Sequence, residues 1–203
     1  MTILVLDPRW PEMIPRRALG RILAPVEFAP EVPISLRWDF DELITAKDPS
    51  GTGTFVTMDP DERGDGTREV IRATSLDDPV DTARRVMHAA RSLGEWEAAQ
   101  THESLLPYLE EESREFTEAV RAGASDEELK KELGDVFLQV LFHAEIASRR
   151  SAFDLSQVAQ SFVDKMRSRA PYLFDGTTEM VEKSRQDELW ALGKQNERTR
   201  ARP

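Results

Sequence analysis

The stretch from 107 to 149 constrains the fold of this chain more than any other, because it predicts a helical hairpin with converging acids. Two segments of helical spacing lie on either side of a short break at residues 122–125. Each segment carries two acids three residues apart, and the four acids are Glu112, Glu115, Glu132 and Asp135. Residues three apart share a helix face, and the two pairs lie at matching distances from the break. If the helices fold back antiparallel, four carboxylates meet at one place.

Local signals predict where these helices begin and end. Gly123 suits the position just after a helix, so the first helix should end near Ala122. Ser125 and Glu128 form a capping box that starts the second helix, which should run to about Arg149. Apolar residues cover most of the circumference of that second helix, so we expect it to be the most buried. Further helices are predicted at 80–93, 154–170 and 178–196, with a loop at 94–97.

The first 78 residues have a different pattern. The apolar run at residues 2–6, closed by Asp7-Pro8, predicts a buried strand, and residues 54–58 and 69–74 are also strand-like. A short helix is expected at 15–22. The predicted fold class is therefore mainly α, a helical bundle of four to five helices preceded by a small α/β region. The predicted domains are an N-terminal region at 1–78, a helical catalytic domain at 79–197 and a disordered tail at 198–203.

Composition excludes several classes of function. The net charge of -11 argues against a nucleic-acid partner and against an anionic membrane partner. The chain has no cysteine, which excludes disulfides, thiolate metal sites and cysteine nucleophiles. No apolar run reaches the roughly 18 residues of a membrane span, and the N-terminus lacks the basic region of a secretory signal. We expect a cytoplasmic protein.

The acidic stripe has two readings. Acidic helix faces are often simply solvated, but this stripe lies on a helix whose other faces are apolar, where Gln139 and His143 extend it. Lys130 and Lys131 are adjacent and point about 100° apart, so both cannot neutralise one acidic cluster. Carboxylates crowded in a half-buried groove therefore require a cation. A site with only oxygen ligands suits Mg²⁺, with Mn²⁺ as the alternative, rather than zinc.

At these residues the chain resembles the MazG family of all-α nucleoside triphosphate pyrophosphohydrolases. The family signature is EExxE followed by ExxD, and this chain has Glu111-Glu112-x-x-Glu115 and Glu132-x-x-Asp135. The stretch LGEWEAAQTHESLLPYLEEE is similar to the family's GCPWDxEQTHxSLxPYLxEE, and KKELGDVFLQVLFHAEIA is similar to ELGDLLLQVVFHAxIA. The resemblance covers roughly residues 80 to 197. The family's Cys-Pro before Trp is Gly94-Glu95 here, and the histidines of its HPHVF stretch are absent at 170–174.

The resemblance implies a reaction in which a nucleoside triphosphate and water give the monophosphate and pyrophosphate. Glu112, Glu115, Glu132 and Asp135 would hold Mg²⁺, and a bound water would attack phosphorus. Glu111 or Glu115 is the expected general base. His102 and His143 also match family positions, and we interpret His143 as a structural or supporting residue.

Nucleotide contacts are expected from other helices. Lys165 and Arg169 lie four residues apart, and such a pair suits phosphate oxygens. Trp190 and Lys194 repeat that spacing and resemble the family's WxxxK, while Trp96 is placed to stack on a base. For the two tryptophans the alternative is packing in the core.

Three functional hypotheses remain open at this level. The first is an Mg²⁺-dependent pyrophosphohydrolase that removes non-standard nucleotides, and the second is a dedicated dUTP or dCTP pyrophosphatase. The third is a non-enzymatic helical dimerisation module whose acidic groove binds a basic partner. Because one layer of helices barely covers the apolar second helix of the hairpin, we also expect a homodimer or a higher homo-oligomer.

Overall fold

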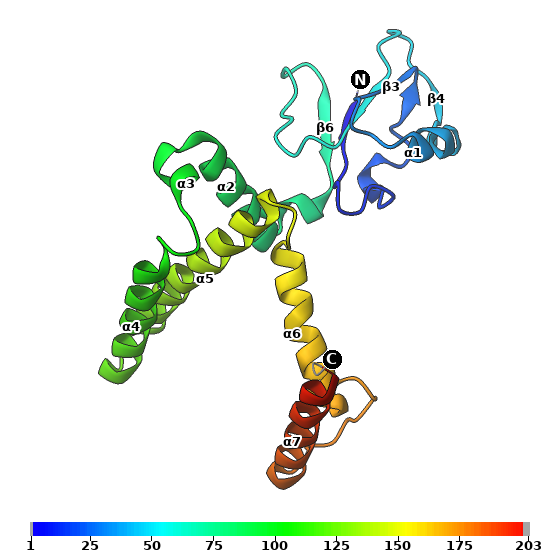
Figure 1. Cartoon of the computed structure of the whole chain (residues 1–203). Helices are drawn as coiled ribbons and strands as arrows, with labels where there is room; N and C mark the ends of the chain where they lie inside the picture. The colour runs from blue at the N-terminus through cyan, green and yellow to red at the C-terminus, as the bar shows by residue number, and fades with distance from the viewer. Residues whose placement is uncertain (1, 201–203) are drawn as a thin grey trace. The chain divides into compact units, whose positions relative to one another are not determined.

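The computed structural model describes residues 2–200, except for the side chain of Arg200. The chain divides into two compact units, Met1–Ala83 and Arg84–Pro203, and each is considered by itself. Figure 1 follows the chain from the α/β unit at its N-terminus into the helical unit.

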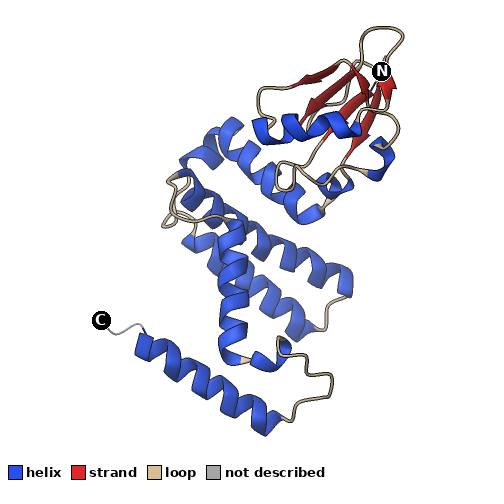
Figure 2. Ribbon diagram, turned by 90° about the vertical axis from the view of Figure 1, so that its right-hand side faces the viewer, coloured by secondary structure: helices blue, strands red, loops and turns tan. Residues whose placement is uncertain are grey.

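A parallel four-stranded sheet forms the centre of the first unit. Its strands, in spatial order, are β3 (Val26–Phe28), β5 (Thr54–Thr57), β1 (Thr2–Val5) and β6 (Glu69–Arg72). Ile3 on β1 pairs with Phe55 on one side and with Val70 on the other. A smaller parallel sheet joins β2 (Leu23–Ala24) to β4 (Ala46–Lys47). Figure 2 shows these strands beside the short helices of this unit.

Strand β1 is buried on both faces, as the run of apolar residues at 3–6 predicted. Leu4 and Leu6 pack into the larger cluster, together with Phe40. Ile3 and Val5 point to the opposite face and pack with Leu76 and its neighbours. Because both faces are covered, Ile3, Leu4 and Val5 are all apolar, while the buried Thr2 donates its hydroxyl to the carbonyl oxygen of Arg21.

The expectations for this unit were right for the strands and wrong for the helix. The three predicted strands are β1, β5 and β6, each within two residues of the expected ends. The predicted helix at 15–22 is only the 3-10 turn η1 (Arg16–Ala18), because Gly20 takes a positive φ of 79°. Helix α1 (Ile34–Asp39) and the 3-10 turns η2 (Phe40–Leu43) and η3 (Thr74–Asp77) were not expected.

Asp7, which follows strand β1, has a structural role. Its buried carboxylate accepts hydrogen bonds from Nε and Nη2 of Arg9, the latter at 2.7 Å, and from the Arg9 backbone N–H. Arg9 also donates to Asp78 and to the carbonyl oxygen of Ser75. These bonds hold the pKa of Asp7 at about 2, well below its usual value, chiefly through the side-chain bond from Arg9. Through Arg9, Asp7 links the end of β1 to the segment that precedes α2.

The second unit is helical. In chain order its elements are α2 (Pro79–Leu93, which begins in the first unit), α3 (Glu95–Ala99), α4 (Leu106–Ala122), α5 (Asp126–Arg149), α6 (Leu155–Arg169), the 3-10 turn η4 (Pro171–Leu173) and α7 (Lys183–Arg200). The expected fold class, mainly α after a small α/β region, is confirmed. Helix α4 packs along α5, and α6 packs along α7. The α6–α7 pair is close at Gly193, where an added Cβ would lie 2.5 Å from the carbonyl oxygen of Ser168.

Three boundaries differ from the sequence predictions. The expected loop at 94–97 lies mostly within the short helix α3. Helix α7 begins at Lys183 rather than near 178, because Asp175 accepts hydrogen bonds from the backbone and hydroxyl of Thr177 and closes a turn there. It continues to Arg200 rather than ending at Asn196, so 198–200 of the predicted tail are helical. The remaining tail residues, 201–203, lie outside the described part of the chain.

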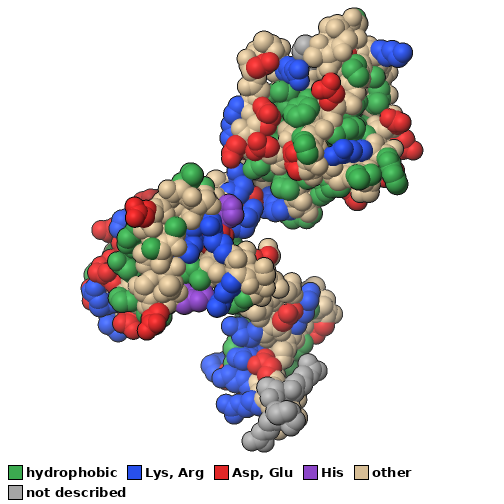
Figure 3. All heavy atoms as spheres, turned by 45° about the horizontal axis from the view of Figure 1, so that its top comes forward, with side chains coloured by type: hydrophobic (Ala, Val, Ile, Leu, Met, Phe, Trp, Pro, Cys, Tyr) green, Lys and Arg blue, Asp and Glu red, His purple; other side chains and the backbone are tan. Residues whose placement is uncertain are grey.

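Many large apolar side chains of the helical unit stay exposed in a single copy (Figure 3). On α2, Leu93 is 87% exposed, and Val86 is exposed as well. Leu133 on α5 and Phe162 on α6 are also more than half exposed. Among the described helices, α5 still has the largest set of buried residues. These buried residues lie in the second half of the helix. Within residues 2–200 no helix has both the length and the apolar character needed to cross a membrane.

Candidate metal centre

The turn between α4 and α5 sets the register of the acidic residues. Gly123 adopts a left-handed conformation with φ of 68°, and its N–H donates to the carbonyl oxygen of Val120, which ends α4. Ser125 then starts α5: its hydroxyl accepts from the Glu128 N–H, and the Glu128 side chain accepts from the Ser125 N–H. Both predictions are confirmed. The tight turn makes α4 and α5 neighbours along their length.

Three of the four predicted acids converge across the hairpin. Glu112, Glu115 and Glu132 each offer a carboxylate oxygen, and these oxygens all lie within 4.8 Å of one another. Asp135 is one turn beyond Glu132 on α5 and acts electrostatically on Glu112. The cluster therefore combines residues from both helices, as the spacing from the turn predicted.

Burial and mutual repulsion make this cluster costly without a cation. The side chain of Glu132 is only 15% exposed, and its Oε2 atom is buried with no hydrogen-bond partner. Burial raises the pKa of Glu112 above its usual value, and the negative charges of Asp135, Glu115, Glu111 and Glu132 raise it further. A buried, unpaired carboxylate oxygen is rare in folded proteins, which indicates that a positively charged ligand completes the site.

Two protein cations partly balance the acids. Lys131 Nζ lies 3.1 Å from Glu132 and 3.8 Å from Asp135, while Lys130 turns away to pair with Glu127. The prediction that both lysines cannot reach the cluster is confirmed, although the sequence analysis had not identified Lys131 as a partner of two acids. On α4, the Arg114 guanidinium lies near the acids on either side of it, which are Glu111 at 3.9 Å, Glu115 at 3.8 Å and Glu118 at 3.2 Å.

The donor set fits a hard divalent cation. All the converging atoms are carboxylate oxygens, which Mg²⁺ and Mn²⁺ prefer. Two oxygens on opposite sides of Mg²⁺ lie about 4.2 Å apart, twice the usual bond length of about 2.1 Å. The three oxygens lie within 4.8 Å of one another, which is close to this value. Lys131 and Arg114 are largely exposed, so either can move aside when a metal ion binds.

Glu111 lies outside the converging set. It is the neighbour of Glu112 on α4, so its side chain points about 100° away around the helix. Its carboxylate is more than half exposed and lies near Arg114 rather than near Glu132. Of the two candidate bases, Glu115 is the one within the cluster.

Trp96 lies on α3 and packs against both helices of the hairpin. Its ring makes edge-to-face contacts with Tyr108 on α4, at a centroid distance of 5.8 Å, and with Phe142 on α5, at 6.0 Å. Half of its surface is exposed nevertheless. Tyr108 lies one turn before Glu112 on α4, and Phe142 lies about two turns after Asp135 on α5, so Trp96 packs on the hairpin on the side of the acidic cluster that is away from the α4–α5 turn.

The remaining predicted contacts gather on the α6–α7 pair. Arg169 donates two hydrogen bonds to Glu197, at 2.6 and 3.1 Å, and its guanidinium lies 5.1 Å from the centroid of the Trp190 ring. Lys165 and Arg169 line an open cavity of about 340 Å³ together with Glu197. Lys194 is exposed on α7, one turn after Trp190. The structure thus brings Lys165, Arg169 and Trp190 together.

Glu197 is a residue that the sequence analysis missed. Its carboxylate pairs with Arg169 at 2.6 Å and so fixes a side chain that was expected to bind phosphate. The signal was present as a stripe, since Trp190, Lys194 and Glu197 follow at steps of four and three on α7.

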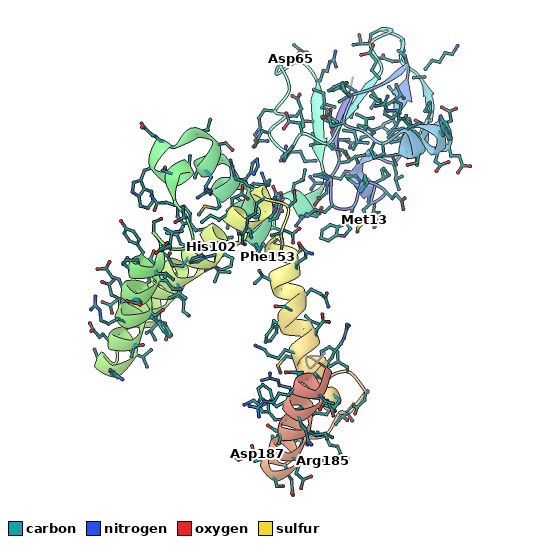
Figure 4. All side chains as sticks on the ribbon, viewed as in Figure 1. Met13, Asp65, His102, Phe153, Arg185 and Asp187 are labelled. Carbon is teal, nitrogen blue, oxygen red and sulfur yellow. The ribbon has the colours of Figure 1, made fainter. Side chains whose placement is uncertain are left out.

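The polar stripe of α5 continues into the interior. Gln139 is buried, and His143 lies beside His102, with 2.8 Å between their Nδ1 atoms. Figure 4 labels His102, which precedes α4 in the chain. Burial and the neighbouring ring lower the pKa of His143, which favours its neutral form. His143 thus ties the segment after α3 to α5, consistent with the supporting role expected for it.

Comparison with known proteins gives two family matches. Residues 100–174 match the MazG nucleotide pyrophosphohydrolase domain, and residues 1–75 match the MazG N-terminal domain. A nucleoside triphosphate pyrophosphohydrolase of Mycobacterium tuberculosis (strain ATCC 25618 / H37Rv) is 34% identical over 212 residues, which cover 98% of this chain and 63% of that protein. One from Mycolicibacterium smegmatis (strain ATCC 700084 / mc(2)155) is 35% identical over 185 residues, which cover 87% of this chain and 57% of that protein.

Among solved structures, the crystal structure of a mazG-related protein from Thermotoga maritima is similar. The TM-score is 0.51 at 27% sequence identity, and the match covers 57% of this chain and 98% of that chain. The present chain therefore matches the whole of this smaller structure, but spans only 63% and 57% of the two mycobacterial relatives.

Proposed function

The chain belongs to the MazG family, and from that membership we propose that it is a nucleoside triphosphate pyrophosphohydrolase. It would convert a nucleoside triphosphate and water into the monophosphate and pyrophosphate. We assign catalysis to the helical domain at 79–197 and propose that the role is to remove non-standard nucleotides from the cytoplasmic pool. The region at 1–78 would form a separate domain.

One observation carries this proposal. Glu112, Glu115 and Glu132 converge from two helices, and the Oε2 atom of Glu132 is buried without a partner. A solvated acidic face would leave its carboxylates in water, where none of them would need a partner. An acidic groove for a basic protein would place the same oxygens at the surface. The buried oxygen favours a small cation, which is what phosphate chemistry requires.

We assign Mg²⁺ to this cluster, with Glu112, Glu115, Glu132 and Asp135 as the residues that would hold it. When bound, the ion would neutralise phosphate charge and lower the pKa of a water molecule, so that the water can attack phosphorus. The protein must also accept the proton of that water. Glu115 is the preferred acceptor because it lies within the cluster, and Glu111 is the alternative.

The nucleotide would be held by aromatic and basic side chains. Trp96 is half exposed and packs on the same hairpin that carries the acidic cluster, which suits stacking on the base of a nucleotide whose phosphates the metal would hold. Lys165, Arg169 and Lys194 would contact phosphate oxygens. The ring of Trp190 would hold the guanidinium of Arg169 by a cation–π contact. Glu197 holds Arg169 through Nε and Nη2, which fixes the guanidinium in place and leaves Nη1 to donate to phosphate.

Substitution of two acids tests the catalytic assignment. Glu115→Gln and Asp135→Asn each remove one charged ligand while keeping the side-chain shape, and we expect pyrophosphate release to fall at least about a hundredfold. Glu118→Gln is the matched control, because Glu118 lies one turn after Glu115, outside the cluster, and pairs with Arg114. Pyrophosphate and monophosphate are measured together for each variant. Full activity in Glu115→Gln and Asp135→Asn would refute the assignment.

A panel of nucleotides decides the substrate. Hydrolysis of many triphosphates would agree with a broad role in removing non-standard nucleotides. A preference of more than a hundredfold for dUTP or dCTP would instead identify a dedicated pyrophosphatase. Release of inorganic phosphate and diphosphate, rather than pyrophosphate and monophosphate, would contradict the proposed reaction.

A further inference from the structure

The segment that carries Trp96 is too short to hold its own shape. Helix α3 has five residues, none of which is buried, and no side chain caps its N-terminus. Helices of this length are unstable by themselves, because the conformational entropy lost in forming the first turn exceeds the free energy gained from its few hydrogen bonds. Its last carbonyl groups also need donors from outside the helix. The conformation of this segment therefore depends on contacts with the rest of the helical unit.

Arg91, near the end of α2, supplies those donors. Its Nη1 atom donates to the carbonyl oxygens of Glu97 at 2.7 Å and Gln100 at 3.1 Å, and its Nη2 atom donates to that of Ala98 at 3.3 Å. The residue is only 7% exposed, so these bonds form in a low-dielectric setting where they are strong. One buried guanidinium thus binds three backbone carbonyl groups within the four residues that follow Trp96.

The ring of Trp96 depends on this arrangement. Its own carbonyl oxygen accepts a hydrogen bond from the Gln100 side chain at 2.9 Å, so the carbonyl group of Trp96 is held as well as three of those that follow it. The ring then meets Tyr108 and Phe142 edge to face and leaves half of its surface open. If the carbonyl groups were released, the ring would lose its fixed orientation relative to the acidic cluster.

We propose that Arg91 is a positioning residue for substrate binding: it fixes the α3 segment so that the open face of Trp96 is oriented to stack on the nucleotide base. This inference rests on the proposed function, because it takes Trp96 as the contact for the base. It adds a residue on α2 that touches neither the metal ligands nor the phosphates. Lysine cannot replace it fully, since a single ammonium lacks the planar fork that reaches three carbonyl groups.

The test uses Arg91→Met, which keeps much of the apolar stem and removes the donors. We expect amide hydrogen exchange of residues 95–101 to accelerate at least tenfold, while exchange elsewhere in the helical unit stays unchanged. For the nucleotide that the wild-type protein hydrolyses fastest, we expect KM to rise about tenfold, the size expected for loss of one base–aromatic stack. The value of kcat should stay within twofold, because the metal ligands are untouched.

A double-mutant cycle separates positioning from general stability. In a Trp96→Ala background, Arg91→Met should raise KM no further, because the residue through which it acts is gone. Arg91→Lys should give intermediate exchange rates and an intermediate KM. Arg149→Met is the matched control: Arg149 also donates to an α2 carbonyl oxygen, that of His88, but it does not touch residues 95–101. That control should leave both readouts unchanged.

Two results would overturn the inference. One is unchanged hydrogen exchange at 95–101 in Arg91→Met, and the other is an equal rise in KM with and without Trp96. Failure of the proposed function has a different signature, namely that the wild-type protein releases no pyrophosphate from any nucleotide. In that case hydrogen exchange would still decide whether Arg91 fixes the α3 segment, and Trp96 would lose its assigned ligand.

Discussion

Glu112 shows how the cost of assembling the cluster can be measured. Burial and four neighbouring acids raise its pKa, so in the metal-free protein its ionised form opposes folding. We expect Glu112→Gln to raise the melting temperature without metal and to reduce or abolish the increase that Mg²⁺ produces in the wild-type protein. Thermal denaturation with and without Mg²⁺ measures both effects.

A matched comparison makes this result specific. Glu118→Gln removes a carboxylate from the same helix, but one that pairs with Arg114 at 3.2 Å at the surface. It should leave the Mg²⁺-dependent increase in melting temperature intact. An undiminished metal effect in Glu112→Gln would mean that this carboxylate does not hold the ion.

The pKa of Asp7 is lowered, whereas that of Glu112 is raised, so the two carboxylates affect stability in opposite directions as the pH changes. Because the pKa of Asp7 is about 2 in the folded protein and about 3.8 when unfolded, it contributes stability above pH 4 that is lost as the pH falls toward 2. The shift corresponds to about 2 kcal/mol of unfolding free energy at neutral pH. Asp7→Asn should therefore be less stable by about that amount at pH 7, and the difference should shrink between pH 4 and pH 2.

Urea denaturation over this pH range measures the effect of Asp7→Asn. A stability difference that stayed constant down to pH 2 would show that the loss comes from geometry rather than from the charge on the carboxylate.

At the scale of elements, the α6–α7 pair depends on one close approach. An added Cβ at Gly193 would lie 2.5 Å from the carbonyl oxygen of Ser168, which is backbone and cannot rotate away. We expect Gly193→Ala to destabilise the protein by about 1–3 kcal/mol, because α7 must move off α6. Chemical denaturation gives this difference, and Arg169 should lose part of its contact with Glu197.

A second helical glycine provides the control. Gly134 lies within α5, and an added Cβ would meet nothing within 4 Å. Alanine is the better helix former by about 1 kcal/mol, so Gly134→Ala should be neutral or stabilising. If both substitutions destabilised the protein equally, close packing at Gly193 would not be the cause of the stability lost in Gly193→Ala.

The sequence predicted the α4–α5 hairpin well because its signals are local. Gly123 and the Ser125–Glu128 capping box lie at the positions where the helices end and begin. The convergence of acids then followed from counting residues on either side of the turn. The short helix α3 was missed because its stability comes from Arg91 on another helix rather than from its own sequence. Contacts of that kind cannot be read from spacing.

The parts of the candidate site that were missed have the same origin. Lys131 was not identified as a partner of both Glu132 and Asp135, because which of two adjacent lysines faces the groove depends on how α5 packs on α4. Glu197 was not identified as the partner of Arg169, because that contact depends on how α7 packs on α6. In the first unit, the strand neighbours of β1 were not predictable, because parallel pairing joins residues far apart in sequence.

At the scale of the whole molecule, a single copy leaves too much apolar surface exposed. Leu93, Val86, Phe162 and Leu133 are each at least half exposed on the helical unit. Exposed large apolar side chains on three helices favour an interface between subunits. We expect a homodimer or larger assembly at micromolar concentration, and sedimentation velocity measures it. A stable monomer under these conditions would contradict the expectation.

The position of β1 in its sheet has a consequence for how the protein is made. Residues 2–5 pair on one side with 54–57 and on the other with 69–72, so β1 has no strand partner until some fifty to seventy further residues have been made. The α4–α5 hairpin, in contrast, closes across a short turn as soon as α5 emerges. Pairing between distant residues slows folding, because the loop must close before any contact forms. During synthesis, β1 therefore stays without its strand partners longer than the strands of the hydrogen-bonded pairs β2–β4 and β3–β5, and it needs protection from other chains until they arrive.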